Sequence, residues 1–296
     1  MHARILFLSA EGKAFPACAW AQQILTEISA AFGHSFSFLK GRAEATLSDG
    51  AVSACQKCQA VFLADADDPA AQALYDEFDL PLAVRAVVLP AALCGRHEAP
   101  VRALLSHVLS LDEETRRAAL RQACALAREE ALPLAHVPPA GAAKAAWTAE
   151  IYAAAQADAV EARDAARRLI LDPNSLGLCL CSPYAGGILL TAASALYGDR
   201  CLVYDSAWDE TAGVYAPALS NADGLHALYS IAAAVAALLR RSLGLSREAD
   251  CVLATLDNVL AAPGETPQST LDLLCSQIAV AGALAGFSHP SKGEDA

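Results

Sequence analysis

Short apolar runs alternate with longer helical segments along most of this chain, and that alternation limits the possible folds more than any other feature. Residues 4–9 form an apolar run that a glycine-containing turn connects to a helical pattern over Ala17–Phe32. Strand-like runs follow at residues 36–39, 60–64 and 82–89, with helical segments between them. Strands that alternate with helices pair mainly in parallel and are covered on both faces. The chain is therefore predicted to be an α/β protein with a largely parallel sheet flanked by helices.

A connector rich in Pro, Gly and Ala at residues 90–100 predicts a domain boundary near its start. Beyond it, Ser110 is predicted to cap a helix, because Glu113 follows three residues later. A loop is expected at residues 182–187, and a helix over residues 188–197. The other predicted strands cover residues 101–109, 132–137, 169–171, 176–181 and 201–204. The other predicted helices cover residues 51–58, 72–77, 113–128, 147–157, 225–243, 246–261 and 268–285, with an irregular stretch from 205 to 224.

Composition and charge exclude several classes of protein. The chain has 296 residues, 55% of them hydrophobic, which is enough for two sub-domains with cores. Its net charge is −12 and its basic residues are scattered, so a nucleic-acid backbone would be repelled. The longest apolar stretch, residues 228–239, falls short of the roughly 18 residues that span a bilayer, so it predicts a buried helix and no membrane partner. With no secretory signal and ten cysteines on predicted strands and helices, the pattern favours free thiols in a cytoplasmic protein.

Several motifs carry a resemblance to a known family. A glycine-bearing loop leads into Gly186-Gly-Ile-Leu-Leu-Thr191, and Gly213-Val-Tyr-Ala-Pro217 follows. An alanine-rich helix then closes in Arg241-Ser-Leu-Gly-Leu245. This order resembles the C-terminal half of the isocitrate and isopropylmalate dehydrogenases, which read Gly-Asp-Ile-Leu-Ser-Asp, Glu-Pro-Val-His-Gly-Ser-Ala-Pro-Asp and a Ser-Leu-Gly-Leu-like segment.

The resemblance extends to the N-terminal half and implies a domain organisation. Leu82-Ala-Val-Arg85 lies where the family has Asn-Leu-Arg-Pro. An isopropylmalate dehydrogenase-like fold has two domains. Its chain leaves the first domain, forms the second, and then returns to the first, so the first domain is made of two separate segments. The resemblance therefore implies a first domain of residues 1–90 and 200–296, and a second domain of residues 91–199 with dimer-forming helices.

The same resemblance implies that the metal site of the family is largely lost. Family members hold a divalent ion with convergent carboxylates and use it during oxidative decarboxylation. Two of the family's metal aspartates correspond here to Gly187 and Thr191, neither of which is an anionic ligand. The third corresponds to Asp164, the single surviving carboxylate, for which a solvated helix charge beside Arg167 and Arg168 is the alternative. No confident metal site is predicted.

The proton-handling groups are also missing under this resemblance, so no catalytic residue is confidently predicted. The family's catalytic lysine falls on Pro138-Pro139, and Lys144 is the nearest possible replacement. The family's catalytic tyrosine lies in a β-arm that this chain lacks, because residue 109 leads straight into a helix cap. Asp164, Lys144 and Tyr184 are the candidates for a catalytic role if one exists.

Substrate and cofactor positions keep some polar residues. Arg85 matches an arginine that grips the substrate carboxylate, with an interdomain salt bridge to an acid such as Asp79 as the alternative. Ser182 and Tyr184 are expected to line the same cleft as Arg85. The family's adenosine loop is replaced by residues 218–223. Its polar positions are Ser220, Asn221 and Asp223, which could equally form an ordinary loop and helix cap.

Two hypotheses follow. In the first, the chain is a degenerate dehydrogenase-like protein that acts as a binding, regulatory or partner subunit and needs no cofactor. In the second, it is an active enzyme on the same scaffold that acts on a small anionic 2-hydroxy acid, with NAD and Mg²⁺ or Mn²⁺. A homodimer, or pairing with a related dehydrogenase subunit, is expected, because Leu189, Leu190, Ala193 and Leu196 give the predicted helix an apolar face.

Overall fold

Ten strands form one continuous sheet in the part of the chain that the computed structural model describes, which is residues 1–9, 17–44, 47–66, 70–94, 101–109, 112–139, 141, 143–155, 157–197, 202–219 and 224–287. The strands are β1 (His2–Ser9), β2 (Ser35–Arg42), β3 (Ala60–Leu63), β4 (Leu82–Leu89), β5 (Val101–Val108), β6 (Leu134–Val137), β7 (Asp158–Ala159), β8 (Leu178–Cys181), β9 (Leu202–Trp208) and β10 (Gly213–Pro217). The helices are α1 (Ala17–Phe32), α2 (Asp49–Cys55), α3 (Ala70–Glu77), α4 (Glu113–Glu129), α5 (Ala143–Ala155), α6 (Ala162–Leu171), α7 (Pro183–Tyr197), α8 (Gly224–Arg241), α9 (Ser246–Ala261) and α10 (Pro267–Phe287).

The sheet is parallel at both ends and antiparallel in its centre. Its strand order is β2-β1-β3-β10-β9-β4-β5-β8-β6-β7, and the pairings β10·β9, β9·β4 and β4·β5 are antiparallel. A tight turn produces the β9·β10 hairpin, because Oδ1 of Asp209 accepts hydrogen bonds from the backbone N–H groups of Thr211 and Ala212. The largely parallel α/β sheet predicted from the sequence is therefore confirmed, and its centre is a feature that the alternation of strands and helices did not reveal.

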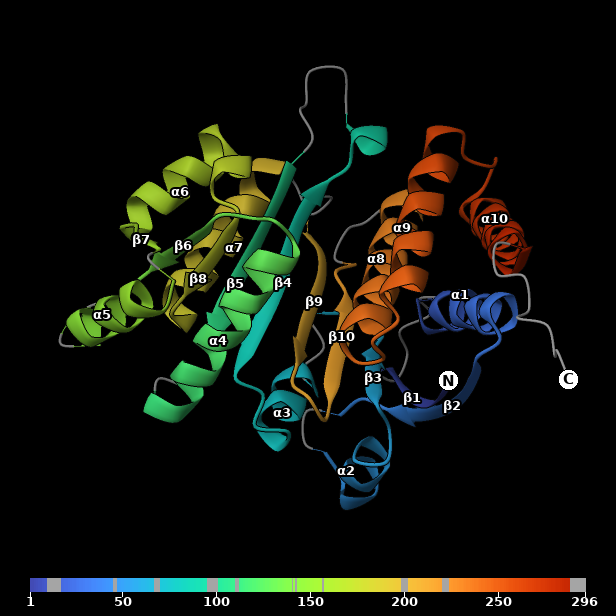
Figure 1. Ribbon diagram of the computed structural model, residues 1–296, viewed down its shortest axis with the longest axis horizontal. Helices are drawn as coiled ribbons and strands as arrows, with labels where there is room; N and C mark the ends of the chain where they lie inside the picture. The colour runs from blue at the N-terminus through green and yellow to red at the C-terminus, as the bar shows by residue number, and fades with distance from the viewer. Residues whose placement is uncertain are drawn as a thin grey trace, which may run out of the picture.

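Apolar packing is continuous on one face of the sheet and divided on the other. The continuous core is built by α1, α4, α5, α8, α9 and α10, and Figure 1 shows α4, α8 and α9 in front of the sheet. On the opposite face, one core lies under α2 and α3 and a second lies under α6 and α7. The division falls along β4, where Ala83 belongs to the first of these cores and Val87 to the second. The middle of that face is therefore the place where apolar packing stops.

Some local predictions were wrong. The N-cap of α4 is Asp112, whose carboxylate accepts from the N–H of Thr115, whereas Ser110 lies outside the described residues. Residues 169–171 end α6 instead of forming a strand, since Leu169 packs on one side of an amphipathic helix. The expected loop at residues 182–187 is already helical, because α7 begins at Pro183, a residue favoured in the first helical turn.

The strand order is compatible with the predicted division into two domains but does not test it. Strands from residues 1–90, together with β9 and β10, make up one side of the sheet, and strands from residues 91–199 make up the other. Eight residue pairs join β4 to β5 across that junction, from Leu82↔Val108 to Leu89↔Val101. The two-domain division stays a prediction, with both parts sharing one sheet.

Two further sequence features can be placed. Within the described residues, no helix has the length and apolarity needed to cross a membrane. The described cysteines are free, and burial raises the pKa of the Cys55 thiol to about 11. Cys55 and Cys58 have the two-residue spacing typical of zinc and redox pairs, but that chemistry requires the thiolate, which burial disfavours at Cys55.

Candidate functional site

Polar side chains occupy the gap between the two cores. Arg85 lies on β4 between Ala83 and Val87 and points to the same face as both, because alternate residues of a strand share a face. Asp205 is its direct partner on β9, and His107 lies on β5 two positions beyond the residue that pairs with Arg85. Tyr75 lies on α3 and is buried in the core that also contains Ala83, on the same face of the sheet as Arg85. These four residues form the central polar cluster.

Arg85 and Asp205 form a buried ion pair. The guanidinium donates to Oδ2 of Asp205, and the two side chains are 17% and 5% exposed. A carboxylate this deeply buried requires a charged or hydrogen-bonding partner. The salt bridge considered from the sequence as the alternative role of Arg85 is therefore present, but its acid is Asp205, because Asp79, the example given there, is exposed in the turn after α3.

His107 lies beneath the first turn of α7. A Cβ added to Gly186 would stand 3.2 Å from Cβ of His107, so the absence of a side chain at this position allows the helix to approach the strand closely. Burial lowers the pKa of His107, an effect that Asp205 opposes and Arg85 reinforces. The imidazole is therefore neutral at pH 7 and can both donate and accept a hydrogen bond.

Two atoms of the central polar cluster have unused hydrogen-bonding capacity. The hydroxyl of Tyr75 and Oδ1 of Asp205 are both buried and have no partner among the described residues. Burial, and next to it the charge of Asp205, raises the pKa of Tyr75, so its hydroxyl remains a donor. The cluster thus combines an arginine neutralised by Asp205 with a donor and an acceptor that no described residue uses.

Ser182 and Tyr184, which were predicted to line a cleft with Arg85, differ in exposure. Ser182 is 6% exposed at the start of α7, where its hydroxyl accepts from the N–H of Ala185 at 3.4 Å. Tyr184 is 81% exposed on the same helix. Ser182 therefore serves the helix end, and the structure provides no contact between Tyr184 and Arg85 within the described residues.

The two remaining catalytic candidates lie at the surface. Nζ of Lys144 pairs with Glu161 at 2.6 Å, and both side chains are about half exposed or more. Asp164 is exposed on α6 and borders a surface pocket of about 430 Å³ together with Arg167 and Arg168. No contact in the described parts of the chain connects Lys144 or Asp164 to Arg85. Ser220, Asn221 and Asp223, the cofactor candidates, lie outside the described residues.

The residues at the implied metal positions do not fit a divalent cation. Gly187 is exposed on α7 with open space where a Cβ would be, and the Thr191 hydroxyl donates to the carbonyl of Gly187 at 2.9 Å. Within the described residues, no group of three His, Cys, Asp or Glu side chains is arranged to hold a metal. Mg²⁺ requires several oxygen ligands, at least one of them a carboxylate. This helix supplies no carboxylate at either position.

Sequence reasoning identified Arg85 but missed the other three members of the central polar cluster. A signal for two of them exists, because His107 stands inside the predicted strand of residues 101–109 and Asp205 directly follows that of residues 201–204. A polar side chain buried in or beside such a run requires a hydrogen-bonding or charged partner. Tyr75 has no comparable signal, since a buried tyrosine on an amphipathic helix is ordinary core.

His107 should make stability depend on pH. Its pKa lies below the ordinary value of 6.5 in the folded protein, so the unfolded chain binds the proton more readily. The stabilising contribution is present above about pH 6.5 and is lost as the pH falls through the folded pKa, by at most about 1.4 kcal/mol per pH unit. Urea unfolding at pH 7.5 and 5.5 should therefore show a smaller acid-induced loss for His107→Asn than for the native protein. The exposed His2→Asn is the control, and equal pH dependence in all three proteins would contradict the assignment.

Comparison with solved structures places this geometry on a known fold. No protein-family model and no curated protein sequence matches the chain. The structure is similar to the TT0538 protein from Thermus thermophilus, with a TM-score of 0.75 and 13% identity over 93% of this chain and 68% of that one. It is also similar to isocitrate dehydrogenase from Methylococcus capsulatus, with a TM-score of 0.74 and 13% identity over 94% of this chain and 100% of that one. The chain therefore has the isocitrate/isopropylmalate dehydrogenase-like fold that its sequence motifs predicted.

Proposed function

We propose that this chain is a non-catalytic member of the dehydrogenase-like fold, a cytoplasmic binding or regulatory subunit without metal- and NAD-dependent decarboxylase activity. The observation that carries the proposal is the ion pair between Arg85 and Asp205. Under the sequence resemblance, Arg85 is the arginine that would grip a substrate carboxylate. Because the chain's own Asp205 already neutralises it, an external carboxylate would have to displace a buried internal one.

Residues around α7 support the same proposal. Gly187 and Thr191 supply no carboxylate, and the Thr191 hydroxyl is used by the helix backbone. Pro139 replaces the catalytic lysine, and Lys144 is held by Glu161 at the surface. Decarboxylation requires a metal to stabilise developing charge and a group to deliver a proton. At positions 187, 191 and 139 the chain supplies neither a carboxylate for the metal nor a side chain that could deliver the proton.

One observation favours the alternative of an active enzyme that uses NAD and Mg²⁺ or Mn²⁺. His107 is neutral at pH 7 and close enough to Arg85 and Asp205 for their charges to affect its pKa. A neutral histidine can act as a general base towards a small 2-hydroxy acid held at the centre of the sheet. The metal would still need ligands that Gly187 and Thr191 do not provide.

Thermal stability with added ligands tests the proposal. Unfolding would be followed with Mg²⁺, Mn²⁺, NAD and malate, because a ligand that binds only the native state raises the melting temperature. We expect no increase with either metal or with NAD beyond that of a salt of equal ionic strength. The variant Gly187→Asp/Thr191→Asp should gain a small increase at millimolar Mn²⁺, because an added side chain at 187 meets open space. An increase in the native protein that saturates at micromolar Mn²⁺ and disappears in Asp164→Ala would overturn the proposal.

We also propose a homodimer, although the apolar face first considered needs correction. Leu189 and Ala193 are fully buried in the chain's own core under α7, so they are not available to a partner. Exposed apolar side chains near them are Ile188 on α7, at 42% exposure, and Leu171 on α6, at 69%. Because α6 and α7 pack together, these side chains give a second copy an apolar surface to cover.

Light scattering after size exclusion checks the dimer. The expected mass is twice 30.7 kDa at micromolar concentration, and Ile188→Glu/Leu171→Glu should shift it towards the monomer. Tyr152→Glu, which places the same charge on an exposed residue of α5, is the matched control. A native protein that elutes at 30.7 kDa would contradict the prediction.

A further inference from the structure

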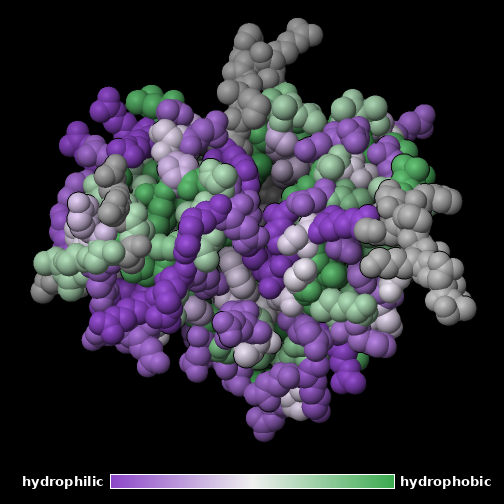
Figure 2. Space-filling model, in the orientation of Figure 1, coloured by the Kyte–Doolittle hydropathy of each residue, from purple (hydrophilic) through white to green (hydrophobic). Residues whose placement is uncertain are grey.

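A cavity lies on the face of the sheet opposite the central polar cluster. It has a volume of about 660 Å³ and is bordered by the C-terminal end of α4, by α8 and α9, and by β4, β5 and β9. Tyr204 lines it, whereas the next residue, Asp205, belongs to the central polar cluster, as expected for neighbours on a strand. Figure 2 shows hydrophilic side chains gathered around a hollow in the middle of this face. The volume is in the usual range for small-molecule sites. We call this cavity the α4–α8 cleft.

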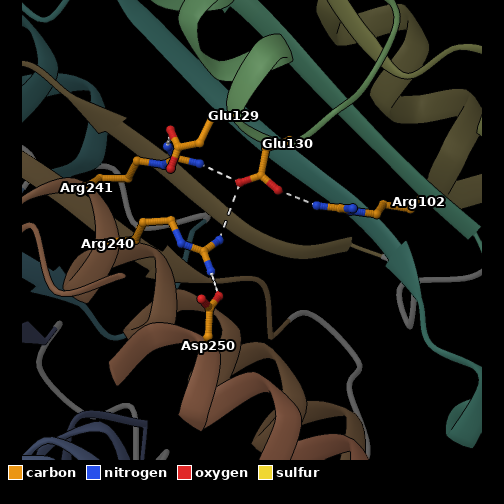
Figure 3. A network of polar contacts seen from close by, with 6 residues as sticks. All are labelled: Arg102, Glu129, Glu130, Arg240, Arg241 and Asp250. Atoms are coloured by element: carbon orange, nitrogen blue, oxygen red, sulfur yellow. Dashed lines mark hydrogen bonds and ion pairs between the residues drawn. The ribbon is translucent and has the colours of Figure 1, made fainter. Parts of the chain in front are cut away.

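An ion-pair network forms part of the lining of the α4–α8 cleft. Glu130 accepts from Arg102, from Arg241 at 2.5 Å and from Arg240 at 3.5 Å, and its side chain is only 12% exposed. Arg240 also pairs with Asp250, and Arg241 with Glu129, as Figure 3 shows. Each arginine is thus already bound by a carboxylate of the chain, and an anionic ligand would have to compete with those carboxylates.

The other polar groups of the cleft lack partners. Tyr229 is 9% exposed and lines the cleft, yet its hydroxyl makes no hydrogen bond with the described residues. The Tyr204 hydroxyl likewise makes none within those parts of the chain. Asp257 borders the same space from an exposed position on α9 and forms no ion pair or hydrogen bond with any described residue. Hydrogen-bonding groups that line a cavity and are not used by the chain itself are available to a ligand.

The charge of the cleft selects the sign of that ligand. Its lining holds four carboxylates, from Glu129, Glu130, Asp250 and Asp257, and three guanidinium groups, from Arg102, Arg240 and Arg241. One negative charge therefore remains, and Asp257 carries it because the other three acids are paired. A cation that donates hydrogen bonds would satisfy Asp257 and the tyrosine oxygens together.

The walls of the cleft add an apolar requirement. They are formed by Val88, Leu104, Ala233, Ala236, Ala237 and Leu253. The three alanines on α8 leave room that larger residues would fill, and the aromatic faces of Tyr204 and Tyr229 attract cations. We propose that the α4–α8 cleft binds a small organic amine, with its ammonium group at Asp257 and Tyr229 and its hydrocarbon body along α8.

Titration calorimetry with three probes of one shape tests this site. Benzylamine is the cation, benzyl alcohol the neutral analogue and phenylacetate the anion. We expect benzylamine to bind at least about tenfold more tightly than either analogue. Asp257→Asn should weaken benzylamine binding by about tenfold or more, and Tyr229→Phe by a smaller factor. Ala237→Leu, which narrows the cleft without changing its charge, should also abolish binding.

Glu265→Gln is the matched control, because it removes one exposed negative charge from the turn between α9 and α10, outside the cleft. It should leave benzylamine binding unchanged, and circular dichroism should show all four variants folded. No benzylamine binding at 10 mM, equal binding of all three probes, or equal loss in Asp257→Asn and Glu265→Gln would each overturn the proposal. None of these outcomes depends on whether the central polar cluster is catalytic.

Discussion

Asp205→Ala is expected to lower the free energy of unfolding by about 3–5 kcal/mol. The substitution removes the Asp205 carboxylate from a largely buried guanidinium, and loss of an ionised partner at a desolvated charge is costly. Arg85→Ala should cost a similar amount, since it leaves Asp205 buried and ionised. Urea denaturation at pH 7 measures both values.

Two control variants distinguish the cost of breaking a buried ion pair from the cost of breaking an exposed one. Lys144→Ala breaks the exposed pair with Glu161 and should cost about 1 kcal/mol or less. The double variant Arg85→Met/Asp205→Leu removes both charges at once and should recover much of the stability lost in either single variant. If Asp205→Ala costs no more than Lys144→Ala, the ion pair is not the buried, self-neutralised unit described above.

Several individual helices and strands could be predicted from sequence because their patterns are local. The bounds of α1, β4 and α9 agree with the predicted ones, since each element has its own periodicity and clear ends. The antiparallel centre could not be predicted in the same way. It depends on a hairpin turn at Asp209, whose side chain organises the backbone, within a stretch that has no helical or alternating pattern long enough to recognise.

The start of α7 shows a different limit. Two adjacent glycines after Pro183 and Tyr184 are typical of a loop, so the helix was predicted to begin at residue 188. In the structure those glycines lie inside the helix, and a Cβ at Gly186 would come within 3.2 Å of His107. Glycine is favoured at position 186 because His107 packs against it, and His107 lies on β5, far away in the sequence. Tertiary packing of this kind overrides local propensity.

The central polar cluster shows the same limit for function. Arg85 could be found because it stands in a recognisable motif. Asp205, its partner, is 120 residues away along the chain, and only the β4·β9 pairing brings the two together. A single sequence supplies the residue type that needs a partner but not the identity of that partner.

The native protein is expected to show no Mg²⁺- or Mn²⁺-dependent oxidation of isopropylmalate, isocitrate, malate or tartrate with NAD or NADP. Gly187 and Thr191 provide no metal carboxylates, and Pro139 stands where the catalytic lysine is expected. Loss of one proton-transfer group alone typically reduces a rate by about 10² to 10⁴, and the metal contributes several kcal/mol more. Gly187→Asp/Thr191→Asp should restore metal binding at most, because the lysine and the tyrosine remain absent.

Spectrophotometric measurement of NADH or NADPH formation tests the central claim most directly, with isocitrate dehydrogenase from Methylococcus capsulatus as the positive control on isocitrate. The proposed function predicts that absorbance at the nicotinamide band stays at the level of the blank for all four substrates, with either metal, for the native protein and for Gly187→Asp/Thr191→Asp. Turnover by the native protein that requires Mg²⁺ or Mn²⁺ and is abolished by Asp164→Ala would contradict it.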